Sequence, residues 1–595
     1  MKKIILIALL FISSYAFTQK PADKRLAGLD TFALKVLKDW NAAGVSIAVV
    51  EKGNVVYTGG FGYRDMEKKL PVTENTLFAI GSCTKAFTSS IIGMLVKEEK
   101  ADLDKPVRNY LPELKFQNEY TNDHATLRDM MCHRTGLPRH DLSWYASWAS
   151  RSELMERIQH LEPTAELRAK WQYNNFMFMA QGVVIEKLTG KSWEENMKER
   201  IFKPLGMDNT NLSTKDLEKS SDRSLAFVST DSTLKVIPYR NIDAMGPAGS
   251  INSSAKDMSK WLITWINGGK YNGKEIIPAS YVNQAMTSQM ATGGGLPGAE
   301  NQDVHTSGYG LAWGINSYRG HYRVEHGGGI DGFITTTGFF PSDSIGIFVV
   351  SNQGGVTNSI RNFIADKMLK LSYRNWNKMQ LDAVNKAKEA AKSVVKNDSI
   401  GRKFNTKPTH DLDNYTGTFT NPGYGSIEIV LRDGKLASQF NSIPIQFEHI
   451  HYDQFKAYPQ DPSLEITEGI LFSFHIDGKG DINKLTVPFE DGVKDIEFEK
   501  EQKAINVNLS ELKKYEGEYE LAPGILAKFY TKNEKTLYAF IEGQPEYELV
   551  PTDKNKFNLK ILKGYSVQFE ENEKKEITAV NFIQPNGTFK APKKK

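Results

Sequence analysis

Residues 79–88 are Ala79-Ile80-Gly81-Ser82-Cys83-Thr84-Lys85-Ala86-Phe87-Thr88, and they combine a nucleophile with a base. Residues 86–97 have helical periodicity, so Ser82 and Lys85 lie three apart on one side of a helix start. A serine hydroxyl becomes a good nucleophile when a neighbour accepts its proton, and a lysine accepts it if burial keeps the amine neutral. The helix N-terminus adds N–H groups for a developing oxyanion. This stretch predicts Ser82 as nucleophile and Lys85 as its base.

The Ser-x-x-Lys pattern is weak evidence by itself because it occurs five times in the chain. The five copies begin at Ser82, Ser232, Ser253, Ser393 and Ser510. The copy at Ser82 is favoured because a strand-like segment and Gly81 precede it and an apolar helix follows it. Two further motifs then occur in a consistent order along the chain.

The second motif is Tyr173-Asn174-Asn175, at the entry to an apolar helix predicted over 176–188. A tyrosine near a lysine loses its proton more easily and can act as a base. An asparagine amide can both donate to substrate and accept from the lysine. The alternative is a helix-capping asparagine beside a packed tyrosine.

The third motif is His326-Gly327-Gly328-Gly329, after a strand predicted over 322–325. Glycines at 328 and 329 let a substrate backbone approach the strand edge closely. The backbone N–H groups of Gly329 and Ser82 would form an oxyanion hole. The alternative is an ordinary glycine turn that carries a surface histidine.

Together these three motifs resemble those of the penicillin-recognising serine hydrolases, which include class C β-lactamases, D,D-carboxypeptidases, D-aminopeptidases and related esterases. That family has Ser-x-x-Lys, Tyr-x-Asn and then Lys-Thr-Gly or His-x-Gly, in this order. Residues 126–138, 201–207, 246–250 and 253–258 are similar to its secondary signatures. The resemblance covers about residues 24–372 and implies an α/β sandwich with an antiparallel sheet and a helical domain.

The resemblance also implies a role for each motif residue. Ser82 would form the acyl-enzyme, and Lys85 and Tyr173 would share proton transfer. Asn175 would position the lysine and the substrate amide. His326 replaces the usual lysine of the family, and it would bind a substrate carboxylate or polarise the site. Because a histidine has a pKa near ~6.5, carboxylate-bearing β-lactams are less securely predicted as substrates.

The expected protein is a serine hydrolase that acts on amide or ester bonds of D-amino-acid peptides, cell-wall fragments or small esters. The partner is therefore a small substrate, and no cofactor or metal is expected. The alternatives are a true class C-like β-lactamase and a penicillin-binding sensor that does not turn over. Two β domains, predicted at 411–502 and 503–592, also allow a homo-oligomer.

The predicted elements of the first 372 residues place strands at both ends and helices between them, which favours a sheet closed by both ends. A hairpin is predicted from 45–50 and 55–57, which flank a Gly-Asn turn. Further helices are predicted at 193–202, 256–266 and 280–286, and strands at 310–315, 322–325, 333–340 and 345–350.

The chain after residue 372 is predicted to form a helical linker and two β domains. Residues 373–410 are predicted as a helical linker, because the segment is rich in alanine and lysine. Two small antiparallel β domains of barrel-like form are predicted at 411–502 and 503–592. Residues 412–419 match 512–519 at an offset of 100, which indicates duplicated modules.

The composition is that of a soluble globular protein, with 40% hydrophobic and 25% charged residues. The formal net charge of only +4 excludes a domain-wide basic field for nucleic acid. Cys83 and Cys132 are interpreted as small buried hydrophobes, although they would be able to pair in an oxidising compartment. His449 and His451 share a strand face without a third metal ligand.

The N-terminus is typical of a secretory signal. Lys2 and Lys3 precede nine apolar residues at 4–12, and small residues follow as far as Ala16. Residues 1–16 are therefore predicted as a cleavable signal peptide, which would make the protein secreted or periplasmic with no stable membrane span. The alternative is an uncleaved anchor.

Overall fold

The computed structural model describes residues 23–230, 233–293, 296–298, 302–397, 402–461, 464, 469–501, 505, 507–533, 535–560, 562, 565–584 and 587–594. The predicted signal peptide lies outside the described residues, and export stays a prediction. The chain forms two compact units, which divide between Glu499 and Lys500.

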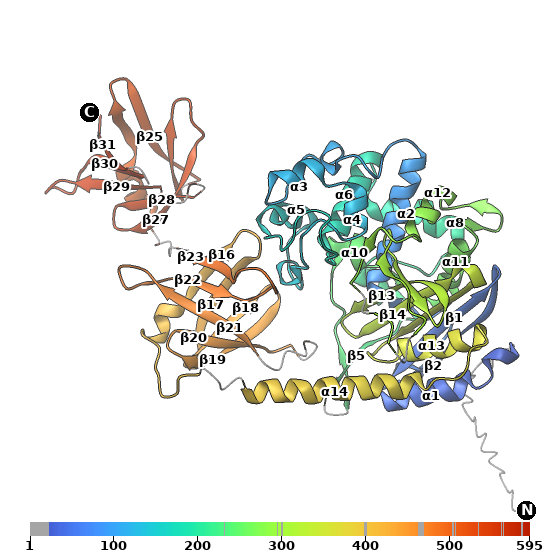
Figure 1. Ribbon diagram of the computed structural model, residues 1–595. Coiled ribbons are helices and arrows are strands. Elements are labelled where there is room, and N and C mark those ends of the chain that lie inside the picture. Colours follow the sequence, from blue (N-terminus) through green and yellow to red (C-terminus); the bar gives the residue numbers. More distant parts are fainter. Residues whose placement is uncertain are drawn as a thin grey trace, which may run out of the picture. The chain divides into compact units, whose positions relative to one another are not determined.

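The first unit contains a nine-stranded antiparallel sheet (Figure 1). In spatial order its strands are β10 (Met290–Ala291), β11 (Ser307–Tyr309), β12 (Gly314–Tyr318), β13 (His321–Ile330), β14 (Phe333–Phe340), β15 (Ile345–Ser351), β1 (Gly44–Glu51), β2 (Asn54–Asp65) and β3 (Leu70–Pro71). Val45 of β1 lies opposite Phe61 on one side and Ser351 on the other. Strands from both ends of this segment therefore pair directly, which confirms the predicted α/β sandwich.

Strand β1, which pairs with β15 and β2, is buried on both faces of the sheet. Val45 and Val49 belong to the apolar cluster that includes α1 (Leu29–Asp39) and α13 (Thr357–Met368). Ala48 and Val50 belong to the other cluster and point to the opposite face, where α11 (Ala255–Ile266) packs. Since successive side chains of a strand alternate between faces, a continuous run of apolar residues is what a strand between two layers requires.

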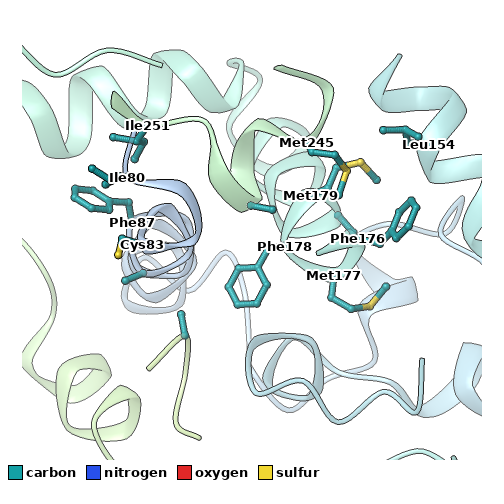
Figure 2. Close-up of a cluster of buried hydrophobic side chains, with 14 of the residues drawn as sticks. Ile80, Cys83, Phe87, Leu154, Phe176, Met177, Phe178, Met179, Met245 and Ile251 are labelled. Atoms are coloured by element: carbon teal, nitrogen blue, oxygen red, sulfur yellow. The ribbon is translucent and has the colours of Figure 1, made fainter. Parts of the chain in front are cut away.

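The larger cluster is built around α2 (Thr84–Lys97) and α6 (Phe176–Thr189), which pack against each other. Figure 2 shows side chains of this cluster around Ile80, Cys83, Phe87, Phe176, Met177, Phe178 and Met179. The predicted helices at 86–97 and 176–188 are therefore confirmed. The chain on either side of Ser82 is anchored in the protein interior.

Eight further α-helices in the described residues between β3 and β11, in addition to α2, α6 and α11, are each at most seven residues long. They are α3 (Glu119–His124), α4 (Leu127–Met131), α5 (Arg151–Arg157), α7 (Trp193–Met197), α8 (Lys203–Leu205), α9 (Thr214–Lys219), α10 (Gly246–Gly249) and α12 (Ala279–Ala285). The helix predicted at 193–202 begins as α7 and continues as a π-helical turn over Lys198–Phe202.

One strand prediction in this unit is wrong over most of its length, and another is correct but too short. Residues 310–313 of the strand predicted at 310–315 instead form a loop between β11 and β12, while Gly314 and Ile315 begin β12. A Cβ at Gly310 would lie 2.1 Å from the Ala285 carbonyl oxygen, and Ala312 has a φ of +65°. The strand predicted at 322–325 extends to Ile330. The glycines after His326 therefore lie inside a strand and not in a turn.

Beyond the sheet, α14 (Trp376–Asn397) confirms the predicted helix that leads to the β domains. The first β domain is a closed barrel of β16 (Gly417–Asn421), β17 (Gly425–Arg432), β18 (Lys435–Phe440), β19 (Ile443–His451), β20 (Gln454–Pro459), β21 (Ile470–Ile476), β22 (Ile482–Val487) and β23 (Ile496–Lys500). It belongs to the first compact unit.

The second β domain forms the second unit. Its strands follow one another in chain order from β24 (Gly517–Ala522) through β25 (Ile525–Lys532), β26 (Thr536–Ile541), β27 (Tyr547–Asp553), β28 (Lys556–Leu559), β29 (Ser566–Glu571) and β30 (Ile577–Gln584) to β31 (Gly587–Pro592). The predicted pair of barrel-like domains is confirmed, and the exact boundaries 24–372, 373–410, 411–502 and 503–592 stay a prediction.

Candidate active site

Ser82 lies in a single 3-10 turn, Gly81–Cys83, which leads directly into α2. Gly81 has a φ of +51°, and a Cβ at this position would lie 2.8 Å from the Gly329 nitrogen. Only glycine combines that backbone conformation with so close an approach. The turn therefore presents Ser82, which is half-buried, beside the glycines of β13.

Lys85 is fully buried and makes three hydrogen bonds through its Nζ atom. The amine lies 3.0 Å from the Ser82 Oγ atom, 2.8 Å from the Asn175 Oδ1 atom and 2.8 Å from the Ala248 carbonyl oxygen. The spacing of three on the helix start brings the lysine to the serine, as predicted. Asn175 and Ala248 come from distant segments and fix the direction of the amine.

The surroundings of Lys85 favour the neutral amine. Burial lowers the pKa of Lys85 well below its usual value, and the nearby Arg139 guanidinium lowers that pKa further. The Asp141 carboxylate has the opposite, smaller effect. A neutral lysine has a lone pair, so Lys85 has the property that a general base requires.

Tyr173 is also a neighbour of the nucleophile, since the Ser82 hydroxyl lowers the pKa of the Tyr173 phenol, an effect smaller than that of burial. Burial raises the pKa of this phenol above its ordinary value, so Tyr173 keeps its proton. The Lys85 amine lies 4.9 Å from the centre of the Tyr173 ring. The structure thus favours the lysine as base and the phenol as proton donor.

Asn175 connects the lysine to a charged pair on the neighbouring loop. Its Nδ2 atom donates to the Asp141 Oδ1 atom at 2.9 Å, while its Oδ1 atom accepts from Lys85. The Arg139 Nε atom donates to the other Asp141 oxygen at 2.7 Å. The helix-capping alternative applies to Asn174, whose Oδ1 atom accepts the Met177 N–H at 3.1 Å.

His326 is buried, and both of its ring nitrogens have partners within the protein. The Nδ1 atom lies 2.5 Å from the Gly327 carbonyl oxygen, which can only accept, so Nδ1 carries the proton. The Nε2 atom then accepts from the Tyr309 hydroxyl at 2.8 Å. Burial lowers the pKa of His326 to about 4, so the ring is neutral at neutral pH. This arrangement offers a substrate carboxylate no imidazolium, and the surface-histidine alternative is excluded by burial.

The glycines of β13 pack directly against the turn that carries Ser82. A Cβ at Gly328 would lie 1.9 Å from the Ile80 carbonyl oxygen, so any other residue would push the strand away. Gly329 lines a cavity of about 370 Å³ together with Ser82. The remaining lining residues are Gly81, Arg139, Asp141, Trp144, Tyr145, Asn175, Ile242, Met245, Ala248, Gly249, Ile330, Asp331 and Ile334. The structure therefore brings all the predicted site residues to one region, with Ser82 at the cavity wall.

Sequence reasoning missed several residues of this region. Tyr309 and Asp331 lie outside the three motifs, and the loop at 139–145 carries no recognisable pattern. Asp331 accepts from the Tyr145 hydroxyl at 2.6 Å and pairs with Arg240. Nothing in the sequence signals these contacts, because their partners are 91 to 186 residues apart.

Other candidate positions have structural roles. The Ser253 hydroxyl is paired with Thr210, while Lys256 three residues later is exposed. Cys83 and Cys132 are both free and buried, as preferred from the sequence. Within the described ranges, the structure has no group of three or more His, Cys, Asp or Glu side chains arranged for a metal ion. None of the helices in those ranges is long and apolar enough to cross a membrane.

The comparison with known families agrees with this geometry. The beta-lactamase family model matches residues 30–366, which is more than half of the chain. The chain belongs to the beta-lactamase family. A second model, for a domain of unknown function (DUF3471), matches residues 401–500, which include the closed barrel. By family the protein is a hydrolase of beta-lactamase fold.

Individual relatives extend the comparison. The chain is 29% identical over 417 residues to Unguisins hydrolase ungD' of Aspergillus campestris, which covers 67% of this chain and 76% of the relative. It is 31% identical over 222 residues to the teichoic acid D-alanine hydrolase of Staphylococcus aureus, covering 37% of this chain and 53% of that protein. The octameric penicillin-binding protein homologue from Pyrococcus abyssi shares the fold, with a TM-score of 0.53, 23% identity, and coverage of 80% and 100% of the two chains.

Proposed function

We propose that this protein is a serine hydrolase that cleaves amide or ester bonds through an acyl-enzyme on Ser82. One contact supports this most strongly: the fully buried Lys85 amine lies 3.0 Å from the Ser82 hydroxyl. Because burial favours the neutral amine, the lysine can take the serine proton as the hydroxyl attacks.

The proposed reaction has two halves. In the first, the Ser82 Oγ atom attacks the substrate carbonyl and its proton passes to Lys85. The backbone N–H groups of Ser82 and Gly329 stabilise the oxyanion. The Tyr173 phenol gives its proton to the leaving amine or alcohol and regains one from the Lys85 ammonium. In the second half a water molecule attacks the ester on Ser82, which releases the acid and restores the serine.

The substrate proposed is a D-amino-acid peptide, amide or small ester. The name of the D-alanine hydrolase relative supports D-aminoacyl chemistry, and the name of the fungal relative supports hydrolysis. A β-lactamase is the second candidate. Neutral His326, with both nitrogens occupied, gives a β-lactam carboxylate little attraction, so nitrocefin should be a slow substrate.

The nucleophile can be tested with a fluorescent fluorophosphonate and a fluorescent penicillin. The wild type should be labelled, and Ser82→Ala should lose the label and at least ~10³-fold in kcat. Ser510→Ala is a matched control, because Ser510 begins another Ser-x-x-Lys sequence at an exposed position. Turnover that persists in Ser82→Ala would remove the assignment, and stable labelling without turnover would support a sensor.

Export and assembly are also proposed on sequence grounds. Cleavage of the signal near Ala16 would be detected by N-terminal sequencing of the protein recovered from outside the cytoplasm. Light scattering of the mature chain would determine whether it forms the homo-oligomer that the two β domains allow.

A further inference from the structure

A second cavity, of about 330 Å³, lies beside the candidate catalytic cavity. Trp144, Ile242 and Met245 line both cavities, so the two spaces adjoin at these side chains. Each cavity has a volume within the range of about 300–1,000 Å³ that is typical of ligand sites. A group attached to a substrate at Ser82 therefore has a neighbouring space to enter.

The walls of this second cavity are largely apolar. They include Ala146, Trp148, Leu154 and Tyr239, in addition to the three shared residues. The Trp148 side chain is 81% exposed, which leaves a large apolar surface in water beside the cavity. Two charged residues, Arg240 and Asp243, and three polar ones, Ser147, Asn241 and Ser442, complete the lining. Arg240 is bound to Asp331 and Asp461. The apolar majority of the lining suits an aliphatic or aromatic group.

One wall of the cavity is held in place by the first barrel. The Asn441 Nδ2 atom donates to the carbonyl oxygens of Leu142 and Tyr145, at 3.2 and 2.9 Å. The Ser442 N–H donates to the Ala146 carbonyl oxygen at 2.9 Å, and Ser442 itself lines the cavity. Ala146 has a φ of +55°, a conformation that a residue with a side chain keeps only when its surroundings impose it. The cavity wall is thus fixed before any ligand arrives.

We propose that this second cavity binds an aliphatic or aromatic group of the substrate, next to the bond that Ser82 attacks. This inference rests on the proposed function and adds that the preferred substrates are apolar and larger than a simple alanyl ester. Burial of such a group in a preformed apolar pocket discriminates about 10–200-fold between large and small substrates. The barrel is then part of the specificity apparatus, because it supplies and holds part of the pocket.

The test compares substrates of different size with a variant that fills the cavity. The acyl group is varied in the p-nitrophenyl esters of acetate, hexanoate and 3-phenylpropanoate. The leaving group is varied in methyl acetate and benzyl acetate, whose hydrolysis is measured by the acetic acid that is released. Wild type should favour the larger group in at least one series by ~10-fold or more in kcat/KM. Ala149 lines only the second of the two cavities, so Ala149→Phe should abolish that preference and leave p-nitrophenyl acetate within about twofold. Ala149→Ser is the matched control that keeps the space open.

The outcomes separate this inference from the proposed function. The inference alone is overturned if Ser82 is labelled but neither substrate series shows a size preference. It is also overturned if a folded Ala149→Phe variant loses the same factor in kcat/KM for all substrates. No labelling and no hydrolysis overturns the proposed function. Calorimetric titration of Ser82→Ala with 3-phenylpropanamide then decides the cavity. Binding that Ala149→Phe removes supports the inference, and no binding overturns it.

Discussion

The two C-terminal β domains repeat the same sequence start but differ in the turn that follows it. Tyr415 and Tyr515 are both buried in their cores, and Gly417 and Gly517 have φ values of +130° and +139°. One residue pattern thus builds both domains. In the first domain the next turn carries Gly423, whose carbonyl oxygen accepts from the Ser143 hydroxyl at 2.5 Å.

The turn after the repeat accounts for this difference. Tyr424 is buried, and its hydroxyl lies 2.7 Å from the His140 Nδ1 atom of the loop beside the catalytic cavity. The equivalent position in the second domain is Gly524, and the adjacent Ile525 is 51% exposed. The shared core residues therefore specify the repeated fold, and the turn residues Gly423 and Tyr424 specify that the first β domain contacts the loop beside the catalytic cavity. The first domain is joined to the site by these residues.

The largest expected effect comes from emptying each barrel core in turn. Tyr415→Ala and Tyr515→Ala should each destabilise their own domain by ~3–5 kcal/mol, because each removes a buried aromatic ring. Tyr415→Ala should also lower kcat/KM, since the first barrel holds the loop at the site through hydrogen bonds, whereas Tyr515→Ala is expected to leave kcat/KM unchanged. Urea unfolding and hydrolysis assays on both variants measure this, and equal loss of activity would refute the distinction.

A smaller effect is expected from the link between the barrel and the loop. Asn441→Ala leaves two carbonyl oxygens without their donor, at a cost of about 1 kcal/mol for each bond. We expect a ~3–10-fold lower kcat/KM for large apolar substrates and faster hydrogen exchange in residues 142–146. Asn581→Ala, which removes a bond to Glu570 in the second barrel, is the control. No change in hydrogen exchange with Asn441→Ala would contradict the role of the barrel.

The charges on the same loop should tune the pH at which the site works. Arg139 lowers the pKa of Lys85 and Asp141 raises it. If neutral Lys85 is the base, activity falls as pH drops through its pKa. Arg139→Gln should therefore move the acid limb of kcat/KM to higher pH, and Asp141→Asn to lower pH, each by up to about one unit. Shifts in the same direction would exclude Lys85 as the group that titrates.

The smallest effect is expected at the contact between Tyr424 and His140. The His140 Nε2 atom lies 2.8 Å from the Glu162 carbonyl oxygen and must donate, so its Nδ1 atom accepts from Tyr424. Tyr424→Phe should cost about 1 kcal/mol and slightly lower activity on large substrates. Tyr519→Phe removes a comparable bond, to the Tyr515 carbonyl oxygen, and should leave activity unchanged. If Tyr424→Phe changes neither stability nor activity on large substrates, the proposed difference between the two β domains would be contradicted.

Much of this molecule was predictable from local patterns. Helical spacing brings Ser82 to Lys85, and the alternation of apolar residues located most strands of the sheet. The strand prediction failed at 310–313, where a close backbone approach at Gly310 and a left-handed conformation at Ala312 occur. The prediction also ended the strand at Glu325, before the glycines that follow His326, because glycines in a strand and glycines in a turn cannot be distinguished from sequence.

The sequence by itself determined the order of the three motifs, the apolar periods of the elements and the duplication of the β domain. These follow from interactions over a few residues, which leave a regular pattern. Only the tertiary structure decided that His326 is held by Tyr309, that Asp141 neighbours the lysine network, and that a turn of the first barrel supports a second cavity. Some of those contacts join residues that are far apart in the chain: Asn441 is 296 residues from Tyr145 and 299 residues from Leu142. A local sequence pattern does not specify which polar residues will meet across such separations.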